Sequence, residues 1–307
     1  MKPLHRGKPR SRQGGTGGRT AAIFLVPFFA LFLFTMIAPL IYSVILSLFA
    51  TKKSGLGFGA SPETIFVGLE NFVEVLSSQS FLAGFGRLAI YIVLYIPAMI
   101  GGALILALLL DSTAALLKRT FQLLLFLPHA VPGVIAALIW TYLYTPGVSP
   151  IVRALESGGI SIDFFSAELV LPAIVNIAVW EWTGFNVIII YTALQAVPRE
   201  VLEAARVDGA GGVRTAIAIK LPLVAPALGV ILLFTSIGSL QLFTQPAILS
   251  TASSAITPTY VPNMWAYDAA FNRLDLNQAA AASIIIAALA GVVSFFITRL
   301  NSKGATA

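Results

Sequence analysis

The chain has 307 residues, of which 58% are hydrophobic and only 10% are charged, and its mean hydropathy is +0.90. Soluble domains carry roughly 25% charged residues, so this composition excludes an ordinary soluble protein and indicates a membrane protein. The absence of cysteine excludes disulfides, thiolate metal sites and cysteine nucleophiles. The net charge of +6 calls for no nucleic-acid partner, because the cations flank apolar runs as they do in membrane proteins.

The first 19 residues, "MKPLHRGKPRSRQGGTGGR", are basic and rich in glycine, and we expect a disordered tail close to anionic lipid headgroups. The next about 30 residues are uncharged, which is longer than the roughly 7–15 apolar residues of a signal peptide, so we expect a retained first span. The stretch "GGTGGRT" lacks the lysine and the preceding strand of a phosphate loop. No cofactor is therefore expected in this chain, and any ATP would be bound with magnesium by a partner.

Six apolar runs reach the roughly 20 residues that cross a bilayer. The run that starts at Leu221 is too long for one helix, but its second half, "QPAILSTASSAITPTYVP", has the composition of a loop. Prolines recur inside the runs and predict kinks. We expect an all-α membrane protein with one transmembrane domain at 20–300, spans at about 20–50, 88–111, 120–144, 169–195, 222–245 and 277–299, and a C-terminal segment at 301–307.

The distribution of lysine and arginine predicts the orientation of the chain. Of the 19 cations, 14 lie in the N-terminal tail, in the second and fourth loops and after the last span. Cations beside spans are retained in the cytoplasm, so we expect both termini and these two loops to be cytoplasmic. The opposite loops hold most of the acids, and the first of them predicts a short amphipathic helix from Glu70 onward, with Leu69, Phe72, Val73 and Leu76 on its apolar stripe.

Glu181 is the only acid well inside a predicted span, about 12 residues or roughly 18 Å from its outer end. An ionised carboxylate at that depth costs a few kcal/mol unless it faces water or a partner. Aromatic and hydrogen-bonding side chains surround it, a mixture that suits the apolar faces and hydroxyl edges of a sugar. The predicted substrate-pathway residues are Glu181, Trp182, Phe185, Asn186, Ser236, Ser239 and Gln241.

The same residues also allow structural interpretations, which are the alternative to a substrate site. The tryptophans near Glu181 are also typical of an interfacial belt, although the calculated depth disfavours one. Ser236 and Ser239 share one helix face, where serine commonly joins membrane helices. His129, in "LPHAVPG", is interpreted as a structural histidine, because no carboxylate partner lies near it in the sequence.

Four cations and three acids gather between Arg199 and Lys220, in the loop between the fourth and fifth spans. Pro198 suits the first turn of a helix, in which Leu202, Ala205 and Gly209 share a smooth face. Glycines then predict a turn, a second short helix runs from Val213 to Lys220, and the fifth span follows. The pattern predicts a helix-turn-helix on the inner membrane face, with a solvated amphipathic loop as the alternative.

The loop carries Glu203-Ala204-Ala205, three residues, Gly209, nine residues, Ile219, one residue, and Leu221-Pro222. This spacing resembles the EAA signature of bacterial ATP-binding-cassette (ABC) importer permeases without a departure. The stretches "FVGLENF", "LPHAVPGVIAALIW", "LQAVPREVLEAARVDGAG" and "GSLQLF" are similar to the carbohydrate-uptake branch of the family, the maltose and glycerol-3-phosphate type. The resemblance extends from about residue 21 to residue 300.

The resemblance implies a type I importer permease fold in the bacterial inner membrane, with a non-catalytic chain. It also implies a second homologous permease subunit, two cytoplasmic ATPase subunits and an extracytoplasmic sugar-binding protein. The EAA loop, residues 196–222, would dock on an ATPase through a short coupling helix. The residues that the resemblance assigns to this coupling are Glu203, Ala204, Ala205, Asp208, Gly209, Ile219, Leu221 and Pro222.

Two other classes of function are weighed against a sugar importer. An ion-coupled secondary transporter would use Glu181 as its coupling carboxylate. A membrane enzyme would need paired reactive groups, and the sequence has no HExxH, GxSxG or clustered carboxylates.

Overall fold

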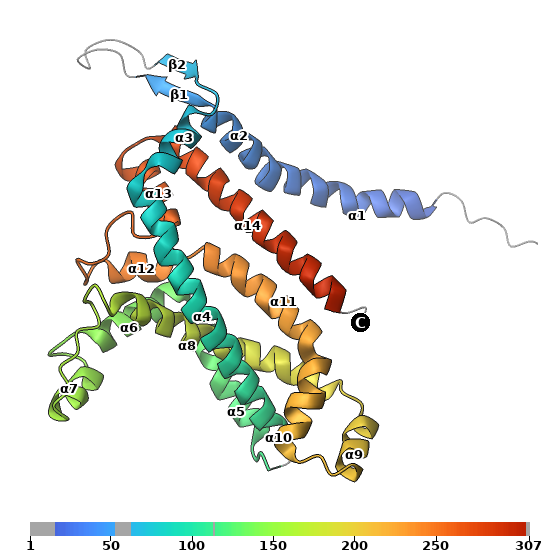
Figure 1. The fold of residues 1–307 in the computed structure, drawn as a ribbon. Helices are drawn as coiled ribbons and strands as arrows, with labels where there is room; N and C mark the ends of the chain where they lie inside the picture. The colour runs from blue at the N-terminus through green and yellow to red at the C-terminus, as the bar shows by residue number, and fades with distance from the viewer. Residues whose placement is uncertain (1–15, 53–62, 113, 305–307) are drawn as a thin grey trace, which may run out of the picture.

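The computed structural model describes residues 16–52, 63–112 and 114–304 (Figure 1). Most of the predicted basic tail and the last three residues of the chain therefore lie outside the described residues. The tail prediction is wrong at its end, because the first helix already begins at Thr16.

Helices make up most of the described chain, so the all-α fold class is confirmed. The N-terminal half contains α1 (Thr16–Phe32), the π-helical turn η1 (Leu33–Ile37), α2 (Ala38–Ser47), strands β1 (Phe49–Lys52) and β2 (Glu63–Phe66), α3 (Glu70–Ser77), α4 (Gln79–Asp111), α5 (Lys118–Phe126), the 3-10 turn η2 (Leu127–Ala130), α6 (Gly133–Tyr144) and α7 (Pro150–Ser157). The C-terminal half contains α8 (Val170–Gln195), α9 (Arg199–Val207), α10 (Gly212–Thr215), the π-helical turn η3 (Ala216–Lys220), α11 (Leu221–Leu240), α12 (Thr244–Leu249), α13 (Pro262–Tyr267), the π-helical turn η4 (Asp268–Asn272) and α14 (Leu276–Gly304).

Among the described residues, five helical segments are long and apolar enough to cross a membrane, and a bent pair of helices makes a sixth. The second of them, α4, begins at Gln79, nine residues before the predicted start at residue 88, because it continues beyond the apolar run. The helix α11, which corresponds to the fifth predicted span at 222–245, ends at Leu240, and a separate short helix, α12, covers the last part of that predicted span.

The core of the molecule lies between α4 and α8. On α4 the buried residues recur every three or four positions, which is the spacing of one helix face. Ala103 and Ala107 are fully buried there, and their small side chains let α8 approach closely. The exposed faces of α4 are as apolar as the buried face. The contacts with neighbouring helices, and not a difference in polarity, therefore determine which face is buried.

The third span is broken. α5 and η2 meet α6 at an angle of 94°, whereas the sequence predicted a kinked but continuous helix over 120–144. Pro128 and Pro132 flank the break, and each removes a backbone donor that a continuous helix would need. Tyr144 ties the far end of α6 to α8, because its hydroxyl donates to the carbonyl of Ala173 and accepts from Asn176 Nδ2.

The first span stands apart from the bundle. Figure 1 shows α1 leading away from the other helices, while α2 packs along α14. Large apolar side chains of the first span, such as Phe24 on α1 and Phe34 in η1, are about three-quarters exposed within this chain. Such a surface suits lipid or another membrane helix and not water.

Two π-helical turns precede prolines. In η1 the Ala38 N–H reaches the carbonyl of Leu33, and in η3 the Leu221 N–H reaches the carbonyl of Ala216. Pro39 and Pro222 follow directly and have no N–H to continue the normal ladder. The backbone at both points is therefore held less regularly than in an α-helix.

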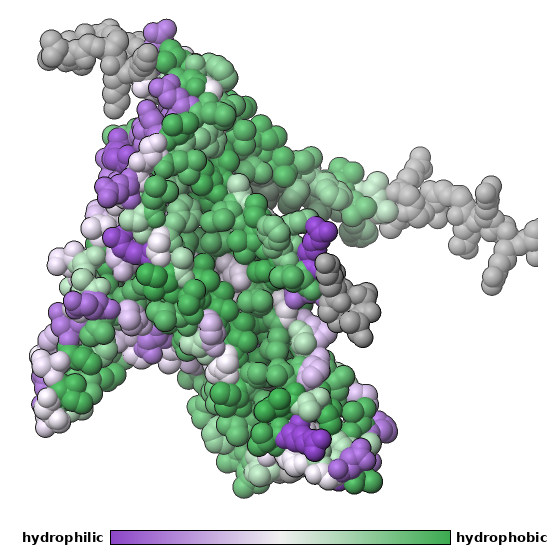
Figure 2. All heavy atoms as spheres, viewed as in Figure 1, coloured by the Kyte–Doolittle hydropathy of each residue, from purple (hydrophilic) through white to green (hydrophobic). Residues whose placement is uncertain are grey.

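Polar groups gather at two ends of the molecule (Figure 2). One end carries the EAA loop, and we call it the EAA end; the other carries α3, α7, α13 and the hairpin of β1 and β2, and we call it the distal end. The hairpin, in which Phe49 pairs with Phe66, is an element that the sequence did not predict. The predicted helix from Glu70 is present as α3, with Leu69, Val73 and Leu76 exposed.

Candidate functional site

The break in the third span lies beside Glu181, the acid that the sequence placed deep in α8. Glu181 is 7% exposed. A side-chain carbon added to Gly133 would lie 3.4 Å from Glu181 Oε1, so this oxygen lies close to the first residue of α6. Because the N-terminus of a helix carries a partial positive charge, α6 stabilises a carboxylate placed there. Broken helices line the binding sites of many membrane transporters.

The other carboxylate oxygen of Glu181 has a side-chain partner. Gln245 Nε2 donates to Glu181 Oε2 at 3.2 Å. Gln245 belongs to α12, the short helix that follows the fifth span, so the contact joins two helices that are 64 positions apart in the chain. A buried carboxylate with an amide donor and a helix N-terminus has the partners that an isolated buried charge lacks.

Aromatic rings continue the site along α8. His129, in η2, lies between two of them, with ring centroids 4.6 Å from Trp182 and 4.5 Å from Phe185, the latter stacked at 26°. Trp182 is 38% exposed, so one part of its ring remains open. Within the part of the chain that the structure describes, the buried Nδ1 of His129 has no hydrogen-bond partner.

The other four predicted pathway residues, all within the described ranges, form no hydrogen bond with Glu181 or with the rings beside it. Asn186 is buried and its Nδ2 donates to the carbonyl of Trp182, one turn back in its own helix, at 2.9 Å. Ser239 bonds in the same way to the carbonyl of Thr235 at 2.7 Å. Ser236 is buried as well, whereas Gln241 is exposed at the end of α11. The structure therefore brings Glu181, Trp182 and Phe185 together and leaves Asn186 and Ser239 bonded to their own helices.

Two residues of the site escaped the sequence analysis. Gln245 was placed at the boundary between the predicted fifth span and the following loop, and only the reversal of the chain into α12 carries it back to Glu181. His129 was interpreted as structural because no acid is near it in sequence, although α8 brings its ring beside the residue that follows Glu181. The pair of prolines around His129 was a usable signal, since it marks a helix break within a span.

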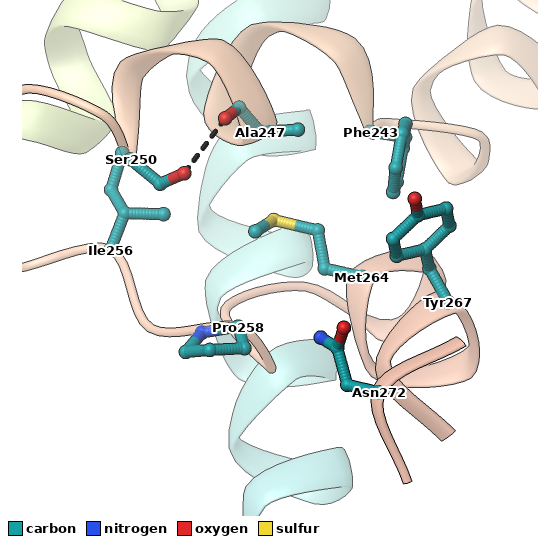
Figure 3. A pocket seen from close by; sticks show the side chains of 8 residues that line it. All are labelled: Phe243, Ala247, Ser250, Ile256, Pro258, Met264, Tyr267 and Asn272. Atoms are coloured by element: carbon teal, nitrogen blue, oxygen red, sulfur yellow. Dashed lines mark hydrogen bonds between the residues drawn. The ribbon is translucent and has the colours of Figure 1, made fainter. Parts of the chain in front are cut away.

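A pocket of about 340 Å³ opens between α12 and α13 at the distal end (Figure 3). Figure 3 shows Phe243 and Tyr267 side by side on one wall, and their ring centroids are 5.3 Å apart. The volume is at the lower limit of ligand pockets. The side chains that line it are Phe243, Ala247, Ser250, Ile256, Pro258, Met264, Tyr267 and Asn272.

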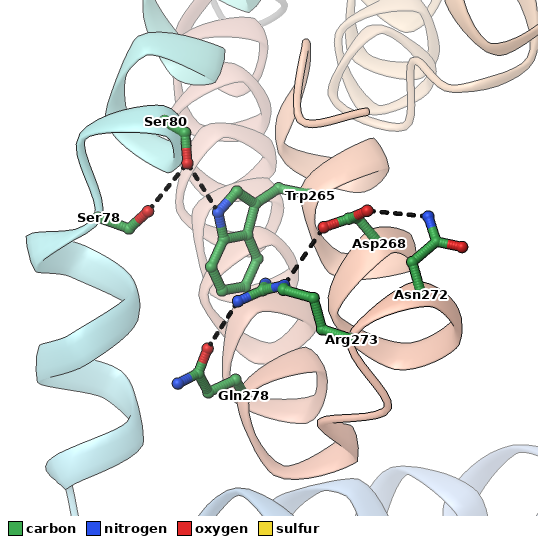
Figure 4. Close-up of polar contacts among 7 residues, drawn as sticks. All are labelled: Ser78, Ser80, Trp265, Asp268, Asn272, Arg273 and Gln278. Atoms are coloured by element: carbon green, nitrogen blue, oxygen red, sulfur yellow. Dashed lines mark hydrogen bonds and ion pairs between the residues drawn. The ribbon is translucent and has the colours of Figure 1, made fainter. Parts of the chain in front are cut away.

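A polar cluster holds the same end together (Figure 4). The guanidinium of Arg273 lies 4.3 Å from the centre of the Trp265 ring, and its Nε is 3.3 Å from Asp268 Oδ2. Trp265 Nε1 donates to Ser80 Oγ at 3.1 Å. Arg273 Nη1 also donates to Gln278 Oε1 on α14 at 3.2 Å, so the cluster joins the start of α14 to α13 and α4.

The EAA loop forms the helix-turn-helix that the sequence predicted, with α9 followed by α10 and η3. Gly209 has a φ of +78°, the left-handed conformation that a turn needs and that glycine adopts without strain. Ala205 is buried, whereas Glu203, Ala204 and Asp208 are exposed. Ile219 and Leu221 are half-buried where the loop joins the bundle, and Pro222 is exposed.

Apolar side chains are also exposed on the EAA loop. Val207 is 87% exposed and Val213 is 74% exposed within this chain. Such residues beside an exposed acid and a small-residue surface are typical of a face that another protein covers.

The far end of the EAA loop is tied to two other helices. Lys220 Nζ forms an ion pair with Asp111 Oδ2, and Gln195 Nε2 donates to Asp111 Oδ1 at 2.6 Å. Asp111 ends α4 and Gln195 ends α8, so the contact joins the loop to the central helix pair.

Residues 72–306 match the family model of the binding-protein-dependent transport system inner membrane component. The sn-glycerol-3-phosphate transport system permease protein UgpA of Yersinia pseudotuberculosis serotype I is 32% identical over 231 residues, covering 75% of this chain and 77% of its own. The diacetylchitobiose uptake system permease protein NgcF of Streptomyces coelicolor is 26% identical and covers 97% of this chain and 90% of its own.

Among solved structures, a chain of a bacterial ABC transporter involved in the import of the acidic polysaccharide alginate has the same fold. The TM-score is 0.81 at 21% identity, over 94% of this chain and 96% of that chain. A second structure of the alginate ABC transporter, in complex with an alginate pentasaccharide-bound periplasmic protein, matches with a TM-score of 0.79.

The fold and the broken span around Glu181 define a multi-pass membrane protein with the type I ABC importer permease fold. The chain belongs to the family of binding-protein-dependent transport system inner membrane components.

Proposed function

We propose that this chain is a permease subunit of an ATP-driven, binding-protein-dependent sugar importer, and that its EAA loop couples transport to a separate ATPase. The observation that carries the coupling role is the exposed surface of the loop. Glu203 and Ala204 are uncovered on α9, with Val207 and Val213 close by in the loop. A partner ATPase that covers this surface would bury apolar area and pair with the glutamate.

The proposal includes the assembly and the orientation of the chain. A second, homologous permease subunit forms the other half of the pathway, and two ATPase subunits bind at the EAA ends. Both termini and the EAA loop lie in the cytoplasm, in keeping with the 14 cations on that side. The distal end then faces an extracytoplasmic binding protein. ATP and magnesium belong to the ATPase partners, and this chain is non-catalytic.

The substrate class in the proposal is a sugar or another small polyhydroxy compound. The two relatives are named for the transport of sn-glycerol 3-phosphate and the uptake of diacetylchitobiose, and both compounds carry more than one hydroxyl group. Glu181 and Gln245 offer charge and hydrogen bonds, and Trp182 and Phe185 offer aromatic faces. This pairing of polar edges with flat apolar faces matches the two kinds of surface of such a substrate.

The coupling role is tested by Glu203→Lys in the assembled transporter. Reversal of the charge is expected to abolish ATP-dependent uptake and to uncouple ATP hydrolysis, while the amount of protein in the membrane stays the same. Glu156→Lys is the matched control, because Glu156 is an exposed acid on α7 at the distal end. Unchanged uptake by Glu203→Lys would refute the coupling role.

A buried carboxylate in a membrane helix also fits a second function, that of an ion-coupled secondary transporter with Glu181 as the coupling group. Uptake that follows the proton motive force and persists after ATP depletion would support this function and refute the importer. Uptake that stops with ATP depletion while the proton gradient is maintained is the result expected here.

A further inference from the structure

One carboxylate gathers the ends of three elements at the EAA end. The two oxygens of Asp111 accept from Lys220, the last residue of η3, and from Gln195, the last residue of α8. The side chains of Lys220 and Asp111 are only 17% and 12% exposed. Hydrogen bonds between charged groups are roughly twice as strong as neutral ones, and shielding from water reduces their screening.

The backbone beside Lys220 is irregular. The π-helical turn η3 ends here, with the Leu221 N–H bonded to the carbonyl of Ala216, and Pro222 supplies no donor to the next turn. A helix end of this kind bends and rotates more readily than a continuous α-helix. The backbone alone is therefore a soft connection between the EAA loop and α11, and the ion pair adds a second connection to α4 and α8.

The contact of Asp111 with Gln195 connects the EAA loop to α8, the helix that carries Glu181. Gln195 and Glu181 lie on the same helix, 14 residues or about 21 Å apart at 1.5 Å per residue. α8 is packed along α4 through most of its length, so a displacement at their common end moves both as a pair. Lys220 itself occupies the position between Ile219 and Leu221 that the EAA spacing leaves unspecified.

From this geometry we propose that Asp111 and Lys220 form a joint, held by Gln195, that transmits displacement of the EAA loop to α4 and α8. Lys220 acts as a positioning residue and touches neither substrate nor nucleotide. The joint rests on the proposed function, since it presumes that an ATPase displaces the EAA loop. Without the ion pair, the EAA loop bends at the flexible backbone of η3, and its displacement is not transmitted to α4 and α8.

The test uses the complete transporter in lipid vesicles, with MgATP as the probe and hydrolysis measured with and without the binding protein. Asp111→Asn and Lys220→Met are each expected to keep basal hydrolysis and to lower its stimulation by the binding protein about 2- to 30-fold, the range seen along coupling networks. The charge-exchanged double variant, Asp111→Lys with Lys220→Asp, is expected to recover stimulation to within about threefold of the unaltered protein. Lys220→Arg is expected to retain it.

Asp268→Asn is the matched control, because it removes an ion pair with Arg273 at the distal end. A purely structural role of Asp111 would lower the yield of assembled complex and leave stimulation per complex unchanged, and that result would overturn the joint. Full stimulation in both single variants, or a double variant no better than the single ones, would overturn it as well. Failure of the unaltered complex to respond to the binding protein would refute the proposed function itself, and the joint with it.

Discussion

Gln245 and Glu181 form a hydrogen bond of 3.2 Å between α12 and α8, at the point where the third span breaks. Through this contact, the short helix α12, which follows the fifth span, touches Glu181, the acid well inside the fourth span. In the proposed importer, this pair belongs to the substrate pathway.

Removal of either partner of that pair is expected to impair uptake. Gln245→Ala deprives a buried carboxylate of its donor, and Glu181→Gln removes the charge at nearly constant size. Hydrogen bonds to charged groups contribute about 1.5–3 kcal/mol, so uptake at low substrate concentration is expected to fall at least tenfold in each.

The control for this prediction is Gln278→Ala, which breaks an exposed bond between a glutamine and Glu74 at the distal end. Initial uptake rates, corrected for the amount of assembled transporter, provide the measurement. Normal uptake rates in both Gln245→Ala and Glu181→Gln would refute the prediction that these two residues belong to the substrate pathway.

Gly184 is expected to tolerate no side chain. A Cβ at this position would lie 1.6 Å from the carbonyl oxygen and 2.3 Å from the carbonyl carbon of Leu125, which are backbone atoms of α5. Overpacking of this kind costs about 1–3 kcal/mol or more, because α5 or α8 must move. Gly184→Ala should lower the thermal unfolding midpoint of the purified protein by several degrees and reduce its yield.

Gly102→Ala is the matched control in the same core. Its added carbon would lie 3.8 Å from Thr183 Cγ2, an ordinary contact. Equal unfolding temperatures for the two variants would show that α5 does not cross α8 at Gly184.

Substitution of Gly209 is expected to impair the protein because of the backbone conformation at this position and not because of a steric clash. Its φ is +78° and an added Cβ would meet no atom within 4 Å. Alanine in this left-handed conformation costs about 1–2 kcal/mol, whereas asparagine adopts it more readily. Gly209→Ala should therefore lower transport-coupled ATP hydrolysis more than Gly209→Asn.

Gly211→Ala serves as the control, since Gly211 has a φ of −68° and also has open space around it. Protease sensitivity of the EAA loop in the membrane reports on its conformation independently of transport. The prediction is contradicted by a Gly209→Ala variant whose hydrolysis and protease pattern match those of the unaltered protein.

Much of the architecture followed from the sequence, and two features show why. The helix-turn-helix of the EAA loop was predictable because Pro198, the glycines around residue 209 and the charge pattern act locally on the backbone. The place of Glu181 well inside the helix α8 was predictable because the long apolar run around it fixes where that helix begins and ends.

The partners of these residues were not predictable. Every face of α4 and α11 is apolar, so periodicity does not reveal which side is buried or which helix lies opposite. The 94° break at Pro128 and Pro132 also depends on α8, whose Gly184 leaves room for the backbone of Leu125.

The sequence by itself therefore determined that this protein crosses a membrane, that its spans run where hydrophobic length permits, and that its EAA loop forms two short helices. These are properties of local composition and backbone chemistry. Only the tertiary structure decided that Gln245 meets Glu181 and that Asp111 joins Lys220 to Gln195. Contacts of this kind depend on how apolar helices pack against each other, and a uniformly apolar surface does not encode one neighbour over another.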